Sequence, residues 1–281
     1  FFLLPPPSYA NNWTSTTAMR IVRQNHTLSL LSSDKVLAVG HETGNRTSEL
    51  FDPTTSLWSL SGTTNFGRKY HTAEVIKING SEKVIVTGGV INISSITNTI
   101  EIFDVNTEIW TLGSNMNTPR AVHESIVLKN GNILVIGGET TGFASSNKVE
   151  EYNPNTNTWV QKSSMVEGRI NLSAILLHDG RVFVAGGANN QSTEIYDPST
   201  DVWIKGPDTI TPHASVTTTL LNNGKVLIVG GFPNMSELFD PITNTITTAS
   251  STNFIHTEHT ATLLNNGNVL ITGSSNSNGR N

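Results

Sequence analysis

Arginine and histidine side chains recur at regular intervals in this sequence, and both can bind an anion through hydrogen bonds. The pattern Arg-X-X-His occurs three times, and weaker copies follow at three further places. The residues that head the six copies are Arg23, Arg68, Arg120, Arg169, His213 and His256. If the six segments lie around one axis, these guanidiniums and imidazoles form a ring that suits a carboxylate or phosphate ligand through bidentate hydrogen bonds. The six residues are therefore candidates for partner binding.

A glutamate in the same repeated unit offers a structural explanation for this ring. It begins the third expected strand of five units, at Glu49, Glu101, Glu150, Glu194 and Glu237. Five carboxylates beside four arginines and two histidines predict an ion pair or a hydrogen-bonded clamp between strands. A residue present in every unit is expected to serve a need of every unit, so the structural interpretation is favoured over a ligand site.

The unit that carries these residues is repeated six times. Its clearest marker is an apolar segment that ends in glycine, such as Lys35-Val-Leu-Ala-Val-Gly40. The six terminal glycines are spaced by 48, 49, 49, 44 and 43 residues: Gly40, Gly88, Gly137, Gly186, Gly230 and Gly273. A second glycine follows in four units, whereas His41 and Ser274 replace it in the first and the last.

Each unit shows signals for up to four strands. The first strand ends at an Asn-Gly or Asp-Gly pair, which predicts a two-residue type I′ hairpin. These pairs are Asn130-Gly131, Asp179-Gly180, Asn223-Gly224 and Asn266-Gly267. The fourth strand carries a tryptophan seven residues after an aromatic residue of the third, at Trp58, Trp110, Trp159 and Trp203, and Ile246 breaks the pattern. We expect these tryptophans to pack between neighbouring units, and Trp13 stands where the last strand of a preceding unit would lie.

Four-stranded antiparallel units at this period predict the blades of a β-propeller. The glycine doublet, the Phe/Tyr-Asp-Pro sequence and the tryptophan seven residues after the aromatic resemble kelch repeats, from Trp13 to Gly273. We therefore expect an all-β, six-bladed β-propeller of kelch type with four-stranded antiparallel blades, in one domain over residues 1–281. The units cover approximately residues 18–60, 61–112, 113–161, 162–205, 206–249 and 250–281.

The ends of the sequence predict how the ring closes. The sixth unit has only two strand signals, over residues 259–267 and 268–274, and the sequence starts with a lone tryptophan-bearing segment. We expect the N- and C-terminal segments to pair, with residues 1–17 supplying an outer strand. This pairing would hide two sheet edges that otherwise invite aggregation.

The resemblance to kelch repeats implies a non-catalytic binding module for a protein or a glycan, and we expect no enzyme, metal or cofactor. The alternative is a propeller enzyme with an atypical site. Kelch-type propellers include enzymes that resemble galactose oxidase, which use copper and a Tyr–Cys cross-link, but this sequence has no cysteine. A sialidase-like enzyme would carry the Asp-box signature Ser-X-Asp-X-Gly-X-Thr-Trp, which is missing.

Composition narrows the range of partners and locations. The formal net charge of −5 and the lack of basic runs argue against nucleic acid. No apolar stretch reaches the ~18 residues that a membrane span needs, so we expect no direct membrane insertion. The Asn-X-Ser/Thr sequons are about as frequent as chance allows, so they and the apolar start at Phe1 favour an extracellular location only slightly. We expect a monomer.

The loops that differ between units are where we expect function to lie. The connections between second and third strands vary most, and two are long, over residues 89–98 and 138–147. The apolar side chains in these connections are Val90, Ile91, Ile93, Ile96 and Phe143, with Phe232 and Met235 in the fifth unit. Apolar residues rimmed by polar ones suit a protein-binding surface, so Phe143 and Phe232 are candidate partner-binding residues.

Overall fold

The protein is all β in a computed structural model that describes residues 15–41, 44–92, 94–142, 144–187, 191–213, 215–231, 234–252 and 255–273. Within these residues there is no helix, and therefore none long and apolar enough to cross a membrane. Five four-stranded sheets and a sixth sheet of two strands follow one another along the chain, and every pair of neighbouring strands is antiparallel. The predicted all-β class and the four-stranded antiparallel sheets are confirmed.

The strands follow the order along the chain in every large sheet. The first sheet contains β1 (Thr27–Leu30), β2 (Val36–Val39), β3 (Thr47–Asp52) and β4 (Leu57–Thr63). The second contains β6 (Thr72–Ile78), β7 (Ser81–Thr87), β10 (Ile100–Asp104) and β11 (Ile109–Leu112). The third contains β12 (Glu124–Val127), β13 (Ile133–Ile136), β16 (Val149–Asn153) and β17 (Thr158–Lys162).

The second half of the chain repeats this plan. The fourth sheet contains β18 (Leu172–Leu176), β19 (Val182–Gly186), β20 (Glu194–Asp197) and β21 (Val202–Lys205). The fifth contains β22 (Thr217–Leu220), β23 (Val226–Val229), β24 (Ser236–Asp240) and β25 (Thr245–Thr248). The sixth contains β26 (Thr260–Leu263) and β27 (Val269–Thr272).

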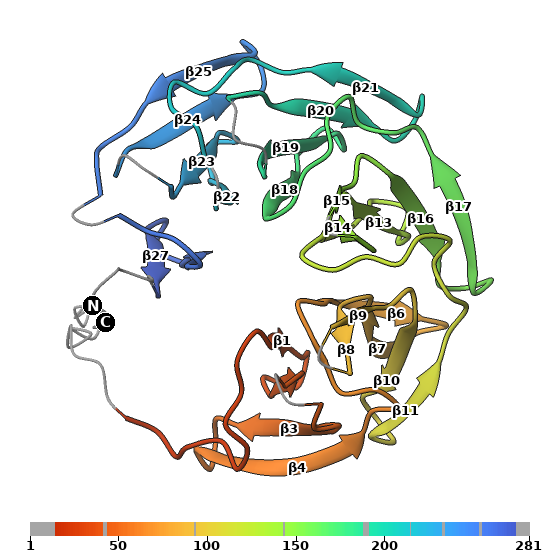
Figure 1. Ribbon diagram of the computed structural model, residues 1–281. Helices are drawn as coiled ribbons and strands as arrows, with labels where there is room; N and C mark the ends of the chain where they lie inside the picture. The colour runs from red at the N-terminus through yellow and green to blue at the C-terminus, as the bar shows by residue number, and fades with distance from the viewer. Residues whose placement is uncertain are drawn as a thin grey trace, which may run out of the picture.

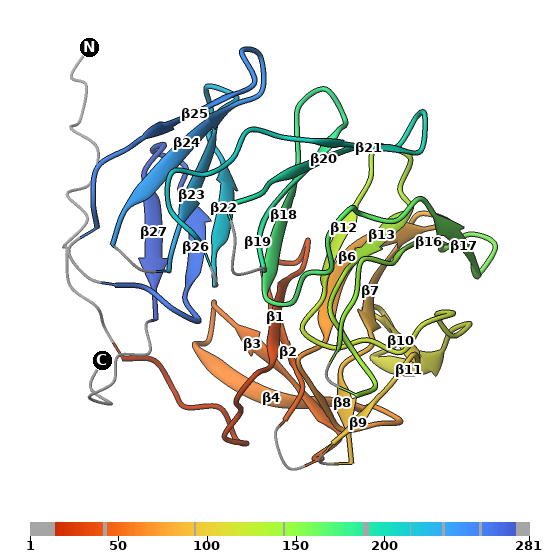
Figure 2. The same ribbon diagram turned by 45° about the horizontal axis from the view of Figure 1, so that its top comes forward.

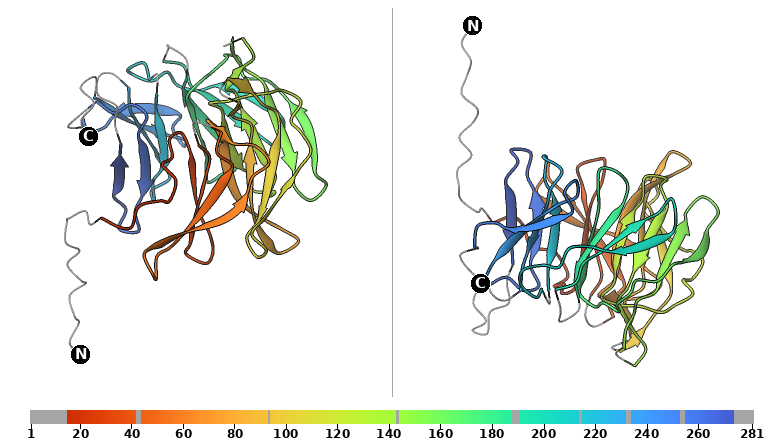
Figure 3. Two further views of the ribbon diagram at one scale, coloured as in Figure 1. Left: turned by 60° about the horizontal axis from the view of Figure 1, so that its bottom comes forward. Right: turned by 90° about the horizontal axis from the view of Figure 1, so that it is seen from above.

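The sheets are arranged like the blades of a propeller around a common centre (Figure 1). The first strand of each sheet lies nearest the centre, and contacts join these inner strands in the order β1, β6, β12, β18, β22 and β26. The fourth strands lie on the outside, and the side view shows the strands running roughly along the axis of the ring (Figure 3).

The core lies between neighbouring sheets, because the second strands are apolar on both faces. All four residues of β13 are fully buried. Leu134 and Ile136 pack against β19 of the fourth sheet, whereas Ile133 and Val135 pack against the second sheet beside Ile85. Alternate side chains of a strand point to opposite faces, so a continuous apolar run is what a strand covered on both sides requires.

The aromatic pairs predicted from the seven-residue spacing lie side by side on the third and fourth strands. Phe103 faces Trp110 across the pair β10–β11 with ring centroids 5.0 Å apart. The indole N–H of Trp110 donates to Ser48 of the first sheet at 3.1 Å. The indole N–H groups of Trp159 and Trp203 donate to the backbone carbonyls of Ser114 and Ser163, which follow the fourth strands of the preceding sheets. These three tryptophans therefore link neighbouring sheets, while Trp13 lies outside the described residues.

The glycine doublet is required where each sheet approaches the next. Gly88 and Gly89 have φ values of +61° and +96°. A Cβ on Gly88 would lie 2.4 Å from the carbonyl oxygen of Arg120, and one on Gly89 would lie 2.6 Å from that of Lys69. A side chain is excluded at both positions by backbone geometry and by space.

The hairpin turns correct one expectation from the sequence. At Asn130-Gly131 the N–H of Gly131 donates to the carbonyl of Leu128, and only the glycine has a positive φ. The loop therefore has three residues, with a turn followed by a left-handed glycine, and is not the predicted two-residue type I′ turn. The type I′ signature, a positive φ at both residues, appears instead at Asn79-Gly80, between paired residues Ile78 and Ser81.

The long loops contain short strands that the sequence did not predict. In the loop between the second and third strands of the second sheet, β8 (Val90–Ile91) and β9 (Ser95–Ile96) form a hairpin, which pairs with β5 (Arg68–Lys69) in a separate three-stranded sheet. In the corresponding loop of the third sheet, β14 (Glu139–Thr140) pairs with β15 (Ala144–Ser145) in a separate two-stranded sheet. The β8–β9 hairpin projects beyond the end of its sheet (Figure 2).

The predicted closure of the ring concerns residues that the structure describes only in part. Within the described residues the sheet of β26 and β27 has two strands, and Trp13 and most of segment 1–17 lie outside them. Residues that follow run along the first sheet, where the N–H of Arg20 donates to Glu49 at 2.7 Å. The number of blades and the closing strand stay predictions.

Candidate functional site

The recurrent arginines lie inside the sheets, and each is paired with the recurrent glutamate of its own sheet. In the third sheet Arg120 Nη2 donates to Glu150 Oε1 at 2.7 Å. Its Nη1 donates to the carbonyls of Gly137 at 2.8 Å and Lys148 at 2.9 Å. The guanidinium therefore joins the ends of the second and third strands. The equivalent ion pairs are Arg23–Glu49, Arg68–Glu101 and Arg169–Glu194, with all four arginine side chains 0% exposed.

The glutamate also holds the connection that enters its sheet. The backbone N–H groups of Asn117 and Thr118 donate to the two oxygens of Glu150 at 2.7 and 3.1 Å. The same pair of backbone donors, two and three residues before the arginine or histidine, reaches Glu49, Glu101, Glu194 and Glu237. We call this repeated unit of arginine, glutamate and backbone the clamp. Its carboxylate has a full set of charge-assisted partners, which is what a buried charge needs.

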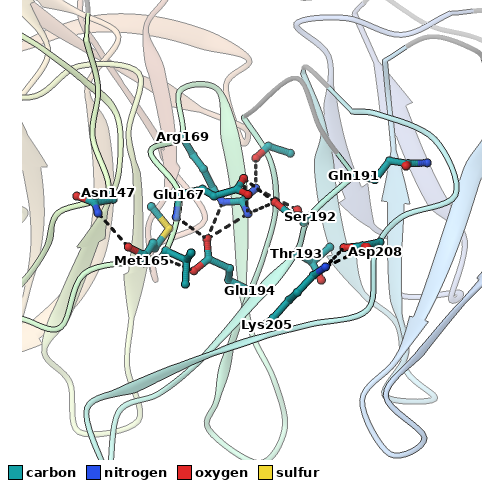
Figure 4. A network of polar contacts seen from close by, with 12 residues as sticks. Asn147, Met165, Glu167, Arg169, Gln191, Ser192, Thr193, Glu194, Lys205 and Asp208 are labelled. Atoms are coloured by element: carbon teal, nitrogen blue, oxygen red, sulfur yellow. Dashed lines mark hydrogen bonds and ion pairs between the residues drawn. The ribbon is translucent and has the colours of Figure 1, made fainter.

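Figure 4 shows the clamp of the fourth sheet. Arg169 donates to one oxygen of Glu194, Oε1, through both Nε at 3.2 Å and Nη2 at 3.1 Å. Nη1 donates to the carbonyl of Gly186 at 2.8 Å, and Nη2 also donates to Ser192 Oγ at 2.7 Å. A lysine at this position could not make this forked set of contacts.

Histidine replaces arginine in the clamp of the fifth sheet. The ring of His213 contacts the carbonyl of Gly230 through Nδ1 and Glu237 Oε1 through Nε2, the latter at 3.1 Å. Burial raises the pKa of Glu237, but hydrogen bonds from His213, Ile210 and Thr211 outweigh it and hold that pKa below its usual value. Both of these partners, a backbone carbonyl and a carboxylate oxygen, are hydrogen-bond acceptors.

The clamp bears on whether the predicted ring of arginines and histidines is open to a carboxylate or phosphate ligand. The four arginines are enclosed by protein and already bonded to glutamate, so a ligand in the centre does not meet a free guanidinium. His213 is equally buried, whereas His256 is half-buried and forms a β-bridge with Gly231. Of the other predicted binding residues, Phe143 and Phe232 lie outside the described part of the chain.

Three histidines that follow the clamp join neighbouring inner strands. Nε2 of His71 lies 3.0 Å from Thr27 Oγ1 in the preceding sheet. His123 contacts Thr72 and His259 contacts Thr217 in the same way. Burial, with the charge of Arg68 and of His26, lowers the pKa of His71 to about 3, while the carbonyl of Val39 opposes this. These imidazoles are therefore neutral at physiological pH.

Left-handed backbone marks one mouth of the central channel. Two residues after each of the four clamp arginines, φ is positive: Asn25 at 53°, Tyr70 at 56°, Val122 at 52° and Asn171 at 56°. Backbone hydrogen bonds connect them in series, from Tyr70 N–H to Asn25, from Val122 N–H to Tyr70 and from Asn171 N–H to Val122, at 3.0 to 3.3 Å. Such conformations are strained for tyrosine and valine and persist where the surroundings impose them.

A cavity of about 440 Å³ lies at this mouth, lined by the inner parts of the first four sheets. Its wall includes the four left-handed residues, three histidines and the carboxyls of Glu74 and Glu124. Burial raises the pKa of Glu74 to about 7, against a hydrogen bond from Ser125. Burial and the charge of Glu74 raise the pKa of Glu124 to about 8. Sequence reasoning missed both glutamates because they belong to no repeated motif.

A groove of about 500 Å³ lies between the two hairpins of the long loops. It is lined by Val90 and Ile96 of the β8–β9 hairpin and by Glu139 and Gly142 of the β14–β15 hairpin. Tyr70 lines both the groove and the channel cavity, so the two hollows adjoin at this residue. Of the predicted apolar residues of the loop that carries β8 and β9, Val90, Ile91 and Ile96 are half-exposed, and Ile93 lies outside the described residues.

No group of three or more metal-ligating side chains is present among the residues that the structure describes. The polar cavity and the partly apolar groove at this mouth are the candidate places for a partner.

Comparisons with known proteins agree with the geometry of the repeats. Residues 25–231 match the model of the KLHDC2/KLHL20/DRC7 Kelch-repeats domain. A search of curated proteins found no match. Among solved structures, the chain is similar to a fungal alcohol oxidase of the AA5 family in complex with copper, with a TM-score of 0.57 and 16% identity. That similarity covers 92% of this chain and 71% of the oxidase, and at this identity it concerns the fold alone.

Removal of a clamp arginine is expected to destabilise the protein strongly. Arg120→Met leaves the Glu150 carboxylate buried without its cation, which costs about 3–5 kcal/mol in the free energy of unfolding. Arg181→Met is the control, because Arg181 pairs with Asp179 at a partly exposed site, where the loss is below about 1 kcal/mol. Urea titration of both variants measures the difference, and equal stabilities would contradict a structural role for the clamp.

The buried histidines predict a loss of stability in acid. The folded-state pKa of His71, about 3, lies below the ordinary histidine value of 6.5, so the unfolded state binds the proton more readily between these values. The free energy of unfolding should therefore fall as the pH drops from about 6.5 towards 3. His71 alone should account for a loss of about 2–3 kcal/mol at pH ~4.5.

His71→Leu should reduce this acid sensitivity, since Leu172 occupies the equivalent position in the fourth sheet. Unfolding free energies at neutral and acid pH, compared with those of the exposed-site control His178→Leu, test it. An unchanged pH profile in His71→Leu would contradict the prediction.

Proposed function

Because this chain belongs to the kelch-repeat family, we propose that it is a non-catalytic binding module that recognises a protein or a glycan. The loops around one mouth of the propeller supply the contact surface. One observation supports this proposal. The recurrent arginines and glutamates are bonded to one another in the clamps, whereas residues that vary between sheets line the mouth.

The groove between the β8–β9 and β14–β15 hairpins is the proposed centre of this surface. Its wall combines aliphatic side chains, Val90 and Ile96, with polar ones at the edge. Binding surfaces have this composition, an apolar centre within a polar rim. The hairpins belong to neighbouring sheets, so the sheets fix the width of the groove and little ordering is needed when a partner binds.

We also propose that the propeller has six blades, the last completed by residues near the N-terminus. Six inner strands in contact with one another in sequence order support this number. The sheet of β26 and β27 has two strands where the other five sheets have four, so two more strands would complete it. A crystal structure in which β27 pairs with no segment of the first 17 residues would contradict the proposed closure.

The competing proposal is a propeller enzyme of the sialidase-like or galactose-oxidase-like type. Metal analysis of the purified protein, together with turnover assays on sialosides and galactose, distinguishes the two classes. Activity that stays with the protein through purification would overturn the binding module.

Substitution of a groove residue is expected to abolish partner binding without loss of the fold. Ile96→Asp places a charge in the apolar centre of the groove, and binding to a ligand found on protein and glycan arrays should weaken by about tenfold or more. Val160→Asp is the control, because Val160 is a similar side chain, 57% exposed on the outer strand β17. A ligand that binds both variants as well as it binds the unaltered protein would contradict the groove as the site.

A further inference from the structure

The wall of the channel cavity carries negative charge without a compensating cation. Neither lysine nor arginine lines it, and its three imidazoles have lowered pKa values, so they are neutral near pH 7. Among the groups that line the cavity, the carboxyls of Glu74 and Glu124 are those that can carry negative charge near that pH. Within the described residues, no ion pair joins either carboxyl to a basic side chain.

The two glutamates are departures from the repeat. Glu124 pairs with Ile136, the residue before the first glycine of its sheet. At the equivalent position the other five inner strands carry hydroxyl residues: Thr27, Thr72, Ser173, Thr217 and Thr260. Glu74 stands two residues further along, where the other strands carry Ser29, Ile126, Ile175, Thr219 and Thr262. At each of these two places five of the six sheets form without a carboxyl, so the fold itself does not require one.

The two carboxyls destabilise each other's charged form. Glu74 raises the pKa of Glu124, and burial raises that of both, so the empty cavity holds them partly protonated near pH 7. A cation between the sheets would remove this repulsion and displace the protons. An anion would increase the repulsion, so carboxylate and phosphate ligands do not fit this cavity.

We propose that the channel cavity binds a primary ammonium group through the carboxylates of Glu74 and Glu124. The group belongs to a lysine side chain, a free chain N-terminus or a small amine. The ammonium has three donors, and Ser125 and the amide oxygens of Asn25 and Asn171 offer further acceptors on the same wall. A divalent cation is less suited, because no group of three metal-ligating side chains exists among the described residues.

The site goes beyond the proposed function and can be tested without the partner of the groove. Titration calorimetry with Nα-acetyl-lysine methylamide measures binding, and the Nα,Nε-diacetyl derivative is the uncharged control. A dipeptide amide with a free N-terminus and n-butylamine distinguish the three sources of the amine.

The affinity for the lysine derivative should rise from about pH 6 to about pH 8, because Glu74 and Glu124 lose their protons over this range. The other titratable groups that face the cavity are Tyr70 and the histidines His26, His71 and His123, and burial lowers the pKa of all three histidines below its usual value. Heats measured in two buffers of different ionisation enthalpy should show proton release on binding.

Glu74→Gln/Glu124→Gln should weaken this binding by about tenfold or more and remove its pH dependence. Glu139→Gln, in the groove, is the matched control and should bind the amine unchanged. Thermal melting verifies that both variants fold. The proposal is overturned if the folded protein binds none of the three amines, if the acetylated derivative binds equally well, or if the double variant keeps the affinity. Binding of Ca²⁺ or Mg²⁺ in place of the amines would overturn it as well. Any of these results leaves the test of the groove intact.

Discussion

A buried arginine–glutamate pair is the interaction on which the arrangement of this protein depends. In four sheets the guanidinium joins the ends of the second and third strands, and the carboxylate also holds the backbone that arrives from the preceding sheet. One group of contacts thereby fixes both the interior of a sheet and its position relative to the chain before it. A buried pair of this kind is costly to desolvate, and it is stable only because every oxygen and most N–H groups have partners.

The mouth of the channel follows from the clamps. The clamps fix the backbone two residues before Tyr70 and Val122, the positions with positive φ. The glycine doublet packs against this backbone. The hydrogen bonds between successive left-handed residues then join the sheets into a rigid rim. Glu74 and Glu124 of the cavity and the side chains of the groove lie outside the clamps and differ from sheet to sheet.

Much of the fold is predictable because it rests on patterns that repeat. Apolar second strands, terminal glycines and the seven-residue aromatic spacing each reflect a local requirement that every sheet shares. The turn type was mispredicted, because Asn-Gly supports both a type I′ turn and a turn closed by a left-handed glycine, and the choice depends on the register of the strands. The hairpins within the long loops have too few residues for a periodic signal.

The candidate sites are less predictable for the same reason. Arg68 and Glu101 attract attention through their recurrence, and recurrence marks a structural role. Glu74 and Glu124 occur once each, at positions where the other inner strands carry threonine, serine or isoleucine, and only the assembly of adjacent sheets places them in one cavity. A comparison of the repeats with one another, strand by strand, would have found them as exceptions.

The central claim is that the clamp glutamates hold the connections between sheets, and amide hydrogen exchange tests it most directly. The amides of Asn65, Phe66, Asn117, Thr118, Val166 and Glu167 lie outside the strands of the sheets but donate to buried carboxylates. The account predicts that they exchange as slowly as amides within the sheets. Exchange at the rate of exposed loops would contradict it.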